Sequence, residues 1–251
     1  MAGRKFHDVR AFHGTWEGVY DGRRARLRIV VTQEAPGTLC TLYLTFTDID
    51  RGETFTGSRE RLPWNCHEVG SITLSGAATL FWPSLLIHTG DTDVLSGVSD
   101  RSNRRYPMSF HRSATGPSYV RDRPFGSFDD WCGAPVGRAR YAGSLDGRRA
   151  QLDVDVSSAG SERRFVFHLA DLDRKADWYA HVAESEVRRW SYDRQRNPLA
   201  GVRMSPYWDR QEPLLIGYMY WHSGNAAYVT GEYVVQGSPY GMSFIRARVG
   251  T

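Results

Sequence analysis

Two nearly identical heptapeptides constrain the fold of this chain more than any other feature. DGRRARL occupies residues 21–27, and DGRRAQL occupies residues 146–152. Further matches follow in the same order, with small drifts in spacing of the kind that loop insertions produce. They pair Asp48-Ile49-Asp50-Arg51 with Asp171-Leu172-Asp173-Arg174, His88-Thr89-Gly90 with His222-Ser223-Gly224, Leu95-Ser96-Gly97 with Val229-Thr230-Gly231, and Tyr106-Pro107-Met108-Ser109-Phe110 with Tyr240-Gly241-Met242-Ser243-Phe244. Matches that stay in register over this length indicate a tandem duplication of a unit of roughly 110 residues.

The duplication divides the chain into two predicted domains. The first repeat covers residues 1–115, a linker covers 116–135, and the second repeat covers 136–251. The stretch 113–135 contains three prolines and no sustained periodicity, which is typical of a surface linker. Each repeat is long enough to bury a core of its own, so we expect each to fold separately.

Hydrophobic residues alternate with polar ones along the matched segments, which predicts β-strands. Leu27, Ile29 and Val31 share one face of the first repeat's second segment. In FVFHLA, residues 165–170, the side chain of His168 falls on the face opposite the phenylalanines. Successive side chains of a strand point to opposite faces of a sheet, so each strand has one buried side. Only residues 175–193 are compatible with a short helix.

The start and end of each repeat resemble the calycins, the family of lipocalins and avidins. GTWEG at residues 14–18 is similar to the calycin pattern of the first strand, and Arg112 ends the last predicted strand of the first repeat. In calycins the tryptophan closes the barrel floor, and an arginine packs across its ring in a cation–π contact. The resemblance gives these roles to Trp16 and Arg112 in the first repeat and to Tyr141 and Arg246 in the second. It also implies that a ligand is captured in a barrel.

These observations predict an all-β protein of two tandem antiparallel β-barrels of the calycin-like kind, joined by the Pro-rich linker. Many short antiparallel strands must hide their edges, and closing a sheet into a barrel does so most completely. A two-sheet β-sandwich in each repeat is the alternative.

Composition limits the classes of function. No stretch approaches the roughly 20 apolar residues of a membrane-spanning helix, and the first residues lack the apolar run of a secretory signal, so we expect a cytoplasmic protein. The three cysteines have no metal-ligand spacing, so we expect no metal and no cofactor. The chain has only two lysines, so arginine supplies 30 of the 32 basic residues. Either a GC-rich genome or the recognition of anions explains this excess of arginine. Because acidic residues are interspersed with these arginines, we expect no nucleic-acid partner, and the chain is predicted to be a monomer or a homodimer.

Recognisable catalytic motifs are lacking, and the acid–base candidates are few. Asp171 and Asp173 repeat Asp48 and Asp50, and carboxylates two residues apart on a strand share a face. His168 adds a titratable group at a position where the first repeat has a threonine. The candidates for catalysis are therefore His168, Asp171 and Asp173. The alternative for the aspartates is turn formation with a surface ion pair.

Aromatic residues are numerous in the middle of the first repeat and throughout the second, where they suit a pocket or shelf for a planar or sugar ligand. Filling of the core is the alternative for any single ring, and the capping of a turn is the alternative for the repeated histidines. The candidate ligand-binding residues are Tyr43, Trp64, Trp82, His88, Trp178, Tyr218, Tyr220 and His222.

The sequence therefore favours a non-catalytic protein that binds a small molecule or a carbohydrate, lectin-like or avidin-like, with a pocket in one or both barrels. The alternative is a lipocalin-like enzyme, of the cyclase or hydratase type, in a natural-product pathway. A third possibility is a structural interaction module. The outer face of one strand carries Arg26 and Arg28 in the first repeat but Asp153 and Asp155 in the second, which predicts that Arg28 and Asp153 lie near an interface between the repeats.

Overall fold

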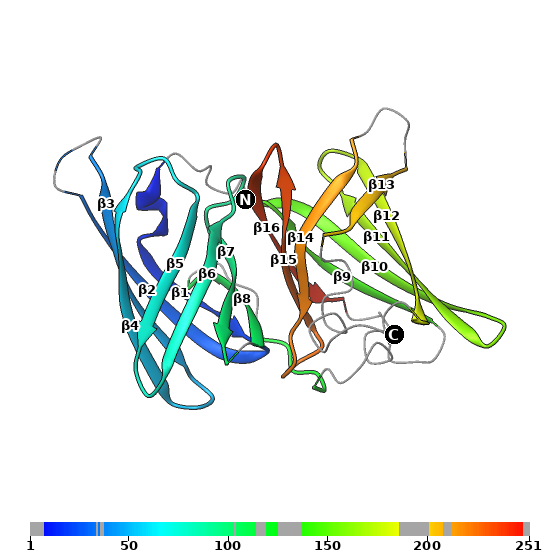
Figure 1. The fold of residues 1–251 in the computed structure, drawn as a ribbon, viewed down its shortest axis with the longest axis horizontal. Helices are drawn as coiled ribbons and strands as arrows, with labels where there is room; N and C mark the ends of the chain where they lie inside the picture. Colours follow the sequence, from blue (N-terminus) through cyan, green and yellow to red (C-terminus); the bar gives the residue numbers. More distant parts are fainter. Residues whose placement is uncertain are drawn as a thin grey trace. The chain divides into compact units, whose positions relative to one another are not determined.

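The structure is a computed structural model that describes residues 8–33, 35, 38–102, 104–113, 119–124, 137–185, 201–207 and 212–247. The chain divides into two compact units, Met1–Tyr119 and Val120–Thr251. Each unit is a closed antiparallel β-barrel of eight strands (Figure 1). The prediction of two tandem barrels is confirmed, and the sandwich alternative is wrong.

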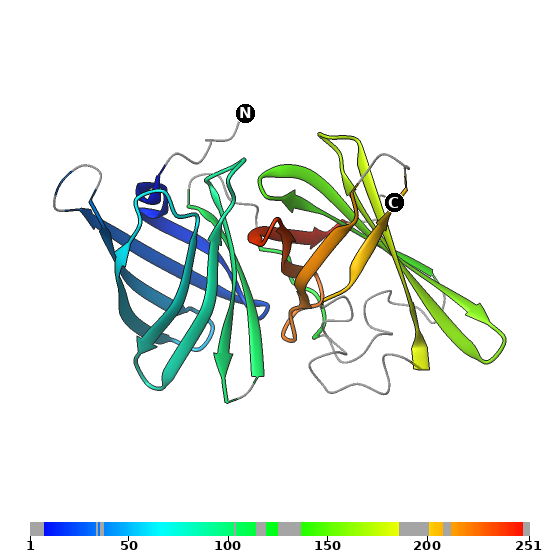
Figure 2. The same cartoon turned by 45° about the horizontal axis from the view of Figure 1, so that its top comes forward.

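Unit 1 consists of a short 3-10 helix followed by eight strands that pair in chain order. The last strand pairs with the first, which closes the sheet into a barrel (Figure 2). In this pair Arg112 lies opposite Trp16. The elements are η1 Val9–Phe12, β1 Gly14–Tyr20, β2 Arg23–Gln33, β3 Cys40–Asp48, β4 Glu53–Leu62, β5 Glu68–Ser75, β6 Thr79–Ile87, β7 Val94–Arg101 and β8 Arg104–Arg112.

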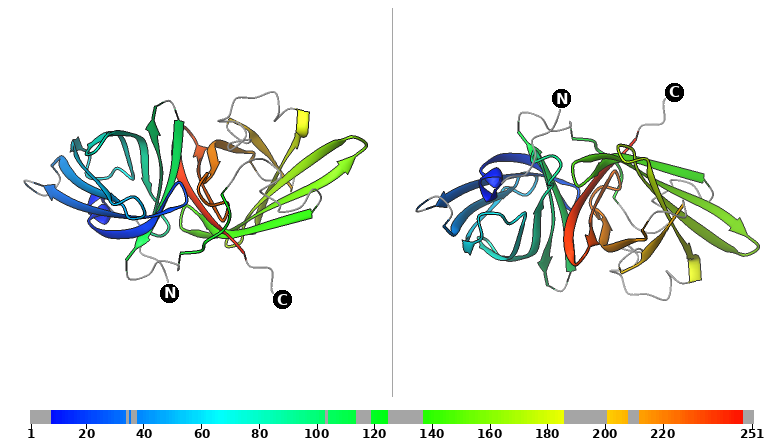
Figure 3. Two further views of the ribbon diagram at one scale, coloured as in Figure 1. Left: turned by 90° about the horizontal axis from the view of Figure 1, so that it is seen from below. Right: turned by 90° about the horizontal axis from the view of Figure 1, so that it is seen from above.

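Unit 2 repeats this order without a helix at its start among the residues described. Its last strand also pairs with its first, which closes the second barrel (Figure 3). In this pair Arg246 lies opposite Tyr141. The strands are β9 Gly137–Leu145, β10 Arg148–Ala159, β11 Glu162–Asp171, β12 Ala176–Ala183, β13 Arg203–Pro206, β14 Leu214–Trp221, β15 Tyr228–Val235 and β16 Ser238–Arg246. The short helix considered for residues 175–193 is wrong over Ala176–Ala183, which form β12. Glu184 and Ser185 are helical, and residues 186–193 lie outside the described residues.

The repeated Asp-Gly pairs form the tight turns that start each barrel. Asp21 and Gly22 have φ angles of 46° and 82°, and Asp146 and Gly147 have 49° and 82°. Positive φ at both central residues is the geometry of a two-residue type I′ hairpin, for which Asp-Gly is a preferred sequence. The turns fix the register of β1 with β2 and of β9 with β10, and so decide which side chains face inward.

The floor of barrel 1 is closed by Trp16 and Arg112. Trp16 is wholly buried, and its Nε1 donates a hydrogen bond of 3.0 Å to the carbonyl of Phe12 in η1. The Arg112 guanidinium lies 4.3 Å from the centre of the indole ring, a cation–π contact. Arg112 also pairs with Asp93 at 2.6 Å and donates to the carbonyl of Ala11. The roles predicted for Trp16 and Arg112 are present in the structure.

The floor of barrel 2 is built differently. Tyr141 is buried opposite Arg246, but the indole comes from β14, where Nε1 of Trp221 donates to the Tyr141 hydroxyl at 3.1 Å. Arg246 pairs with Asp122 at 3.4 Å, and Asn225 donates to the carbonyl of Val120 at 2.8 Å. Part of the predicted linker therefore belongs to the floor of unit 2.

Candidate functional site

Two of the predicted ligand-binding residues point into the barrels. Trp82 is wholly buried in barrel 1, with its ring centre 5.3 Å from that of Phe46. Its Nε1 has no hydrogen-bond partner among the residues that the structure describes. Trp178 lies inside barrel 2, where its Nε1 donates to the carbonyl of Glu212 at 2.9 Å. Large buried side chains thus fill the interior of each barrel.

The other predicted ligand-binding residues do not join these tryptophans. Tyr43, on the outer face of β3, is 52% exposed, and Trp64, in the loop after β4, is 48% exposed. Tyr218 and Tyr220 alternate with the core residues of β14 and face away from the interior of barrel 2. The eight residues therefore do not form one site within either unit.

The repeated histidines make the same local contact in both units. Nε2 of His88 lies 3.1 Å from the hydroxyl of Ser96, and Nε2 of His222 lies 2.8 Å from the hydroxyl of Thr230. Each contact joins the residue just after one strand to the next strand. A hydrogen bond preserved in both repeats fits a structural role in the barrel wall.

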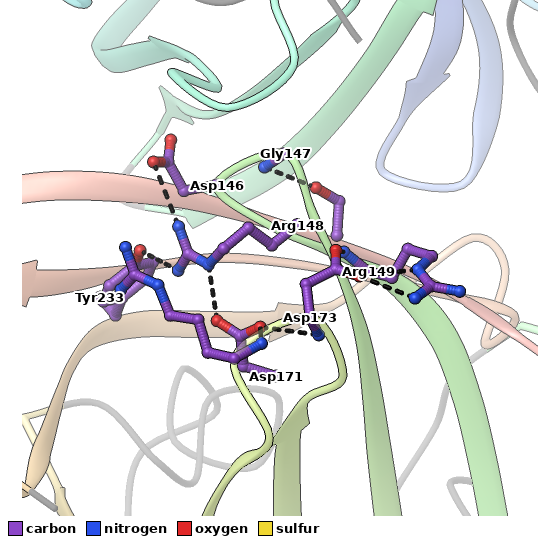
Figure 4. Close-up of polar contacts among 9 residues, drawn as sticks. Asp146, Gly147, Arg148, Arg149, Asp171, Asp173 and Tyr233 are labelled. Atoms are coloured by element: carbon purple, nitrogen blue, oxygen red, sulfur yellow. Dashed lines mark hydrogen bonds and ion pairs between the residues drawn. The ribbon is translucent and has the colours of Figure 1, made fainter. Parts of the chain in front are cut away.

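The repeated Asp-x-Asp motif forms ion pairs with the repeated arginines (Figure 4). In unit 2, Nε of Arg148 lies 2.6 Å from Asp171, and Nη2 of Arg148 donates to the Tyr233 hydroxyl at 3.0 Å. Arg149 donates its backbone N–H to Asp173 at 2.7 Å and its Nε at 2.8 Å. The side chain of Asp171 is wholly buried. Asp171 and Asp173 therefore form ion pairs that join the β11–β12 hairpin to the β9–β10 hairpin.

Unit 1 repeats this network. Nε of Arg23 lies 2.9 Å from Asp48, and Nε of Arg24 donates to Asp50 at 2.8 Å. Because the same pairs hold the same hairpins in both barrels, they explain why these residues match between the repeats. His168 does not join them.

His168 belongs instead to a polar row on the outside of barrel 2, which we call the outer row. It consists of Arg140 on β9, Asp153 on β10, His168 on β11 and Tyr179 on β12, each directly opposite the next in the strand register. Inward-facing neighbours such as Leu152, Phe167 and Trp178 alternate with these residues and form the core of unit 2.

The outer row is specific to unit 2. The corresponding register positions of unit 1 are Thr15, Arg28, Thr45 and Thr56. A duplicated wall that has exchanged three hydroxyls for an arginine, a histidine and a tyrosine has diverged on its outer surface, where packing does not require these residue types.

Asp153 is the centre of charge in the outer row. Its side chain is only 2% exposed, although it faces outward, because two arginine side chains cover it. It accepts hydrogen bonds from Nε of Arg140 at 2.9 Å, from Nε2 of Gln151 at 2.9 Å and from Arg138. The structure thus gives Asp153 two arginine partners within its own unit. That Arg28 and Asp153 lie near an interface between the repeats stays a prediction.

The titration of the outer row follows from these contacts. Burial opposes the ionisation of Asp153, but the facing His168 and Arg140 outweigh it and hold the pKa of that carboxyl well below its usual range. Nδ1 of His168 lies 3.8 Å from Asp153, and Nε2 lies 2.8 Å from Asp177. Asp153, the larger influence, and Asp177 together raise the pKa of His168 against the effect of burial.

An aromatic surface adjoins these charges. The rings of His168 and Tyr179 stack with centres 4.5 Å apart and planes 6° apart. Tyr207, just after β13, lies 5.6 Å from Tyr179 and is 60% exposed. We call His168, Tyr179 and Tyr207 the shelf. The sequence contains a signal for it, since Tyr179 and His168 fall on the same outer face once 176–183 is read as a strand.

We expect the stability of the protein to depend on pH through His168 and Asp153. Because the pKa of His168 is raised in the folded state, its contribution is fully present below about pH 6.5 and is lost as the pH rises through the folded pKa. The pKa of Asp153 is lowered in the folded state. Its contribution to the free energy of unfolding is therefore present above about pH 3.9 and is lost as the pH falls through the folded pKa. Between these limits both contributions are present.

Urea unfolding from about pH 6 to about pH 9 measures the first of these effects. The free energy of unfolding of the unmodified chain should decline with rising pH. That of His168→Gln should decline less steeply, because the variant lacks the titrating imidazole. Equal slopes for the two proteins would show that His168 is not held in its charged form by Asp153 and Asp177.

Comparisons with protein-family models, with curated proteins and with solved structures gave no match for this chain. Within the described ranges, no helix is long and apolar enough to cross a membrane. No group of three or more His, Cys, Asp or Glu residues there is placed to hold a metal ion. The functional argument therefore depends on the geometry of the outer row and the shelf.

Proposed function

We propose that this protein is a non-catalytic carbohydrate-binding protein whose site is the shelf outside barrel 2. The observation that carries the proposal is the 60% exposure of the Tyr207 ring beside the stacked pair of Tyr179 and His168. A sugar ring presents C–H groups to an aromatic face, while its hydroxyls need nearby charged or polar side chains. Asp177, Arg138 and Arg140 supply these at the edge of the shelf.

The arrangement favours binding over acid–base chemistry. A general base needs a ring nitrogen that can reach the proton of a substrate. In His168 each ring nitrogen already faces a carboxylate, Asp177 at 2.8 Å and Asp153 at 3.8 Å. These contacts hold the imidazole as a fixed, charged face of the shelf.

We place the site outside the barrel, although the floor built by Trp16 and Arg112 supports a calycin-like ancestry and calycins bind ligands inside. The reason is packing. Trp16, Phe46 and Trp82 are wholly buried in barrel 1, and Phe167 and Trp221 are wholly buried in barrel 2. A ligand inside either barrel would have to displace such rings, whereas the shelf needs no rearrangement.

A glycan array followed by calorimetry on the full chain tests the proposal. We expect Tyr207→Ala to weaken sugar binding roughly tenfold, because an aromatic stack contributes about 0.5–1.5 kcal/mol and 1.4 kcal/mol corresponds to a factor of ten. Phe81→Ala, which removes a 39% exposed ring from unit 1, is the matched control and should bind as the unmodified chain does. If no glycan binds, or if both variants bind equally well, the proposal is wrong.

A further inference from the structure

We infer that the sugar taken by the shelf is acidic, with its carboxylate bound by Arg138 and Arg140. This inference rests on the proposed function, because it names the class of sugar for the same site. It depends on how the two arginines use their donors and on where they lie relative to the shelf.

The two arginines share a single buried carboxylate. Arg138 reaches Asp153 with Nη2, and Arg140 reaches it with Nε and Nη2. Neither Nη1 has a hydrogen-bond partner among the residues described. The arginine side chains are 52% and 49% exposed, so these donors are open to a ligand. A guanidinium presents five donors in a planar fork that matches a carboxylate, and that fork is only partly used here.

The arginines adjoin the shelf. Asp153 connects them to it, since the carboxylate that they cover lies 3.8 Å from Nδ1 of His168. Arg140 belongs to the same outer row as His168 and Tyr179, and Arg138 binds the same carboxylate as Arg140. One ligand can therefore contact the rings and the arginines together.

The carboxylates nearby do not cover the solvent-exposed side of the Arg138 and Arg140 guanidinium groups. Asp155 lies opposite Arg138 in the strand register and is exposed, but it forms no ion pair with Arg138 in this part of the chain. Asp177 faces His168. A carboxylate on the ligand would bind at the solvent side of the arginine pair, opposite Asp153, and charge-assisted hydrogen bonds of this kind are the stronger ones.

The test compares three trisaccharides on the full chain by calorimetry: one of galacturonic acid, its methyl ester, and one of galactose. They differ at C6, which carries a carboxylate, an ester or a hydroxymethyl group. We expect the acid to bind at least tenfold more tightly than the other two. A sulfated galactose trisaccharide distinguishes a demand for carboxylate from a demand for any anion, and tighter binding of the sulfated sugar would overturn the assignment to a carboxylate.

Arg138→Gln should remove most of the preference for the acid, because it should weaken binding of the acid much more than binding of the galactose trisaccharide. Asp153 keeps Arg140 in this variant, and a thermal melt verifies folding. Arg138→Lys keeps the charge and loses the fork, so it should retain only part of the preference. Arg149→Gln, which alters an exposed arginine paired with Asp173, is the matched control.

The outcomes separate this inference from the proposed function. If all three sugars bind with equal affinity and Tyr207→Ala weakens them all, the shelf binds carbohydrate and the inference of an acidic sugar is wrong. If the acid is preferred equally by Arg138→Gln and by the unmodified chain, the carboxylate is bound elsewhere and the inference again fails. If no sugar binds, both fail.

Discussion

Replacing Trp16 with alanine is expected to lower the free energy of unfolding of unit 1 by about 3–5 kcal/mol, the range for removing a large buried ring. Trp16 is wholly buried, and three contacts depend on it: packing inside barrel 1, the hydrogen bond to Phe12 and the stack with Arg112. Its loss would leave η1 without its anchor and the Arg112 guanidinium without the ring that it covers.

Urea unfolding followed by far-ultraviolet circular dichroism measures this effect. Trp64→Ala is the control, because that side chain is 48% exposed and removing it should cost less than about 1 kcal/mol. A loss below about 1 kcal/mol for Trp16→Ala would mean that the floor of barrel 1 does not depend on the indole. The resemblance to calycins would then carry no weight.

The strands could be predicted because each has one face in a core. Leu27 and Ile29 are wholly or almost wholly buried, whereas Arg28 between them is exposed, and the same alternation runs through Phe165 and Phe167 in unit 2. What the sequence left open was how the sheets close. A barrel differs from a sandwich in the pairing of the first and last strands, such as Trp16 with Arg112. The alternation of side chains does not specify such a long-range pair, and only the resemblance to calycins implied it.

The helix considered for residues 175–193 shows how composition can conceal alternation. Alanine, glutamate and arginine have high helix propensity, and several occur in this stretch. In the structure Trp178 and Ala180 enter the core of unit 2, while Tyr179 lies on the outer face next to His168. Burial of one face of a strand outweighed the intrinsic preference of the segment.

The candidate site could be predicted only in pieces. His168 was recognised as a titratable group that unit 1 lacks, but its neighbours come from three other strands. Arg140, Asp153 and Tyr179 meet it only because of the register across β9 to β12, and a shift of one residue would turn a neighbour to the other face. The two arginines on β9 were not recognised from the sequence as partners of Asp153, because only the strand register brings them to it.

Replacing Asp171 with leucine is expected to lower the free energy of unfolding of unit 2 by about 3–5 kcal/mol, because it removes the nearest counter-charge of a largely buried cation. Asp171 is wholly buried, and the side chain of Arg148 is 18% exposed. Tyr233 and the carboxylate of Asp146 remain near the guanidinium, but Asp146 lies 3.7 Å from Nη1 of Arg148, whereas the lost carboxylate of Asp171 lies 2.6 Å from Nε. Urea unfolding of the full chain measures the loss.

The double variant Arg148→Met with Asp171→Leu decides why the loss occurs. If the cost comes from an unpaired buried charge, removing both partners should restore most of the stability, because apolar residues of similar volume often replace a buried pair without loss. Asp173→Asn, at the exposed pair with Arg149, should change stability little. Asp171 shares the inner face of β11 with Phe167, whereas the shelf lies on the outer face, so the double variant should also keep its affinity for sugar. A double variant that is stable but no longer binds sugar would instead place the carboxylate of Asp171 in the function of the protein.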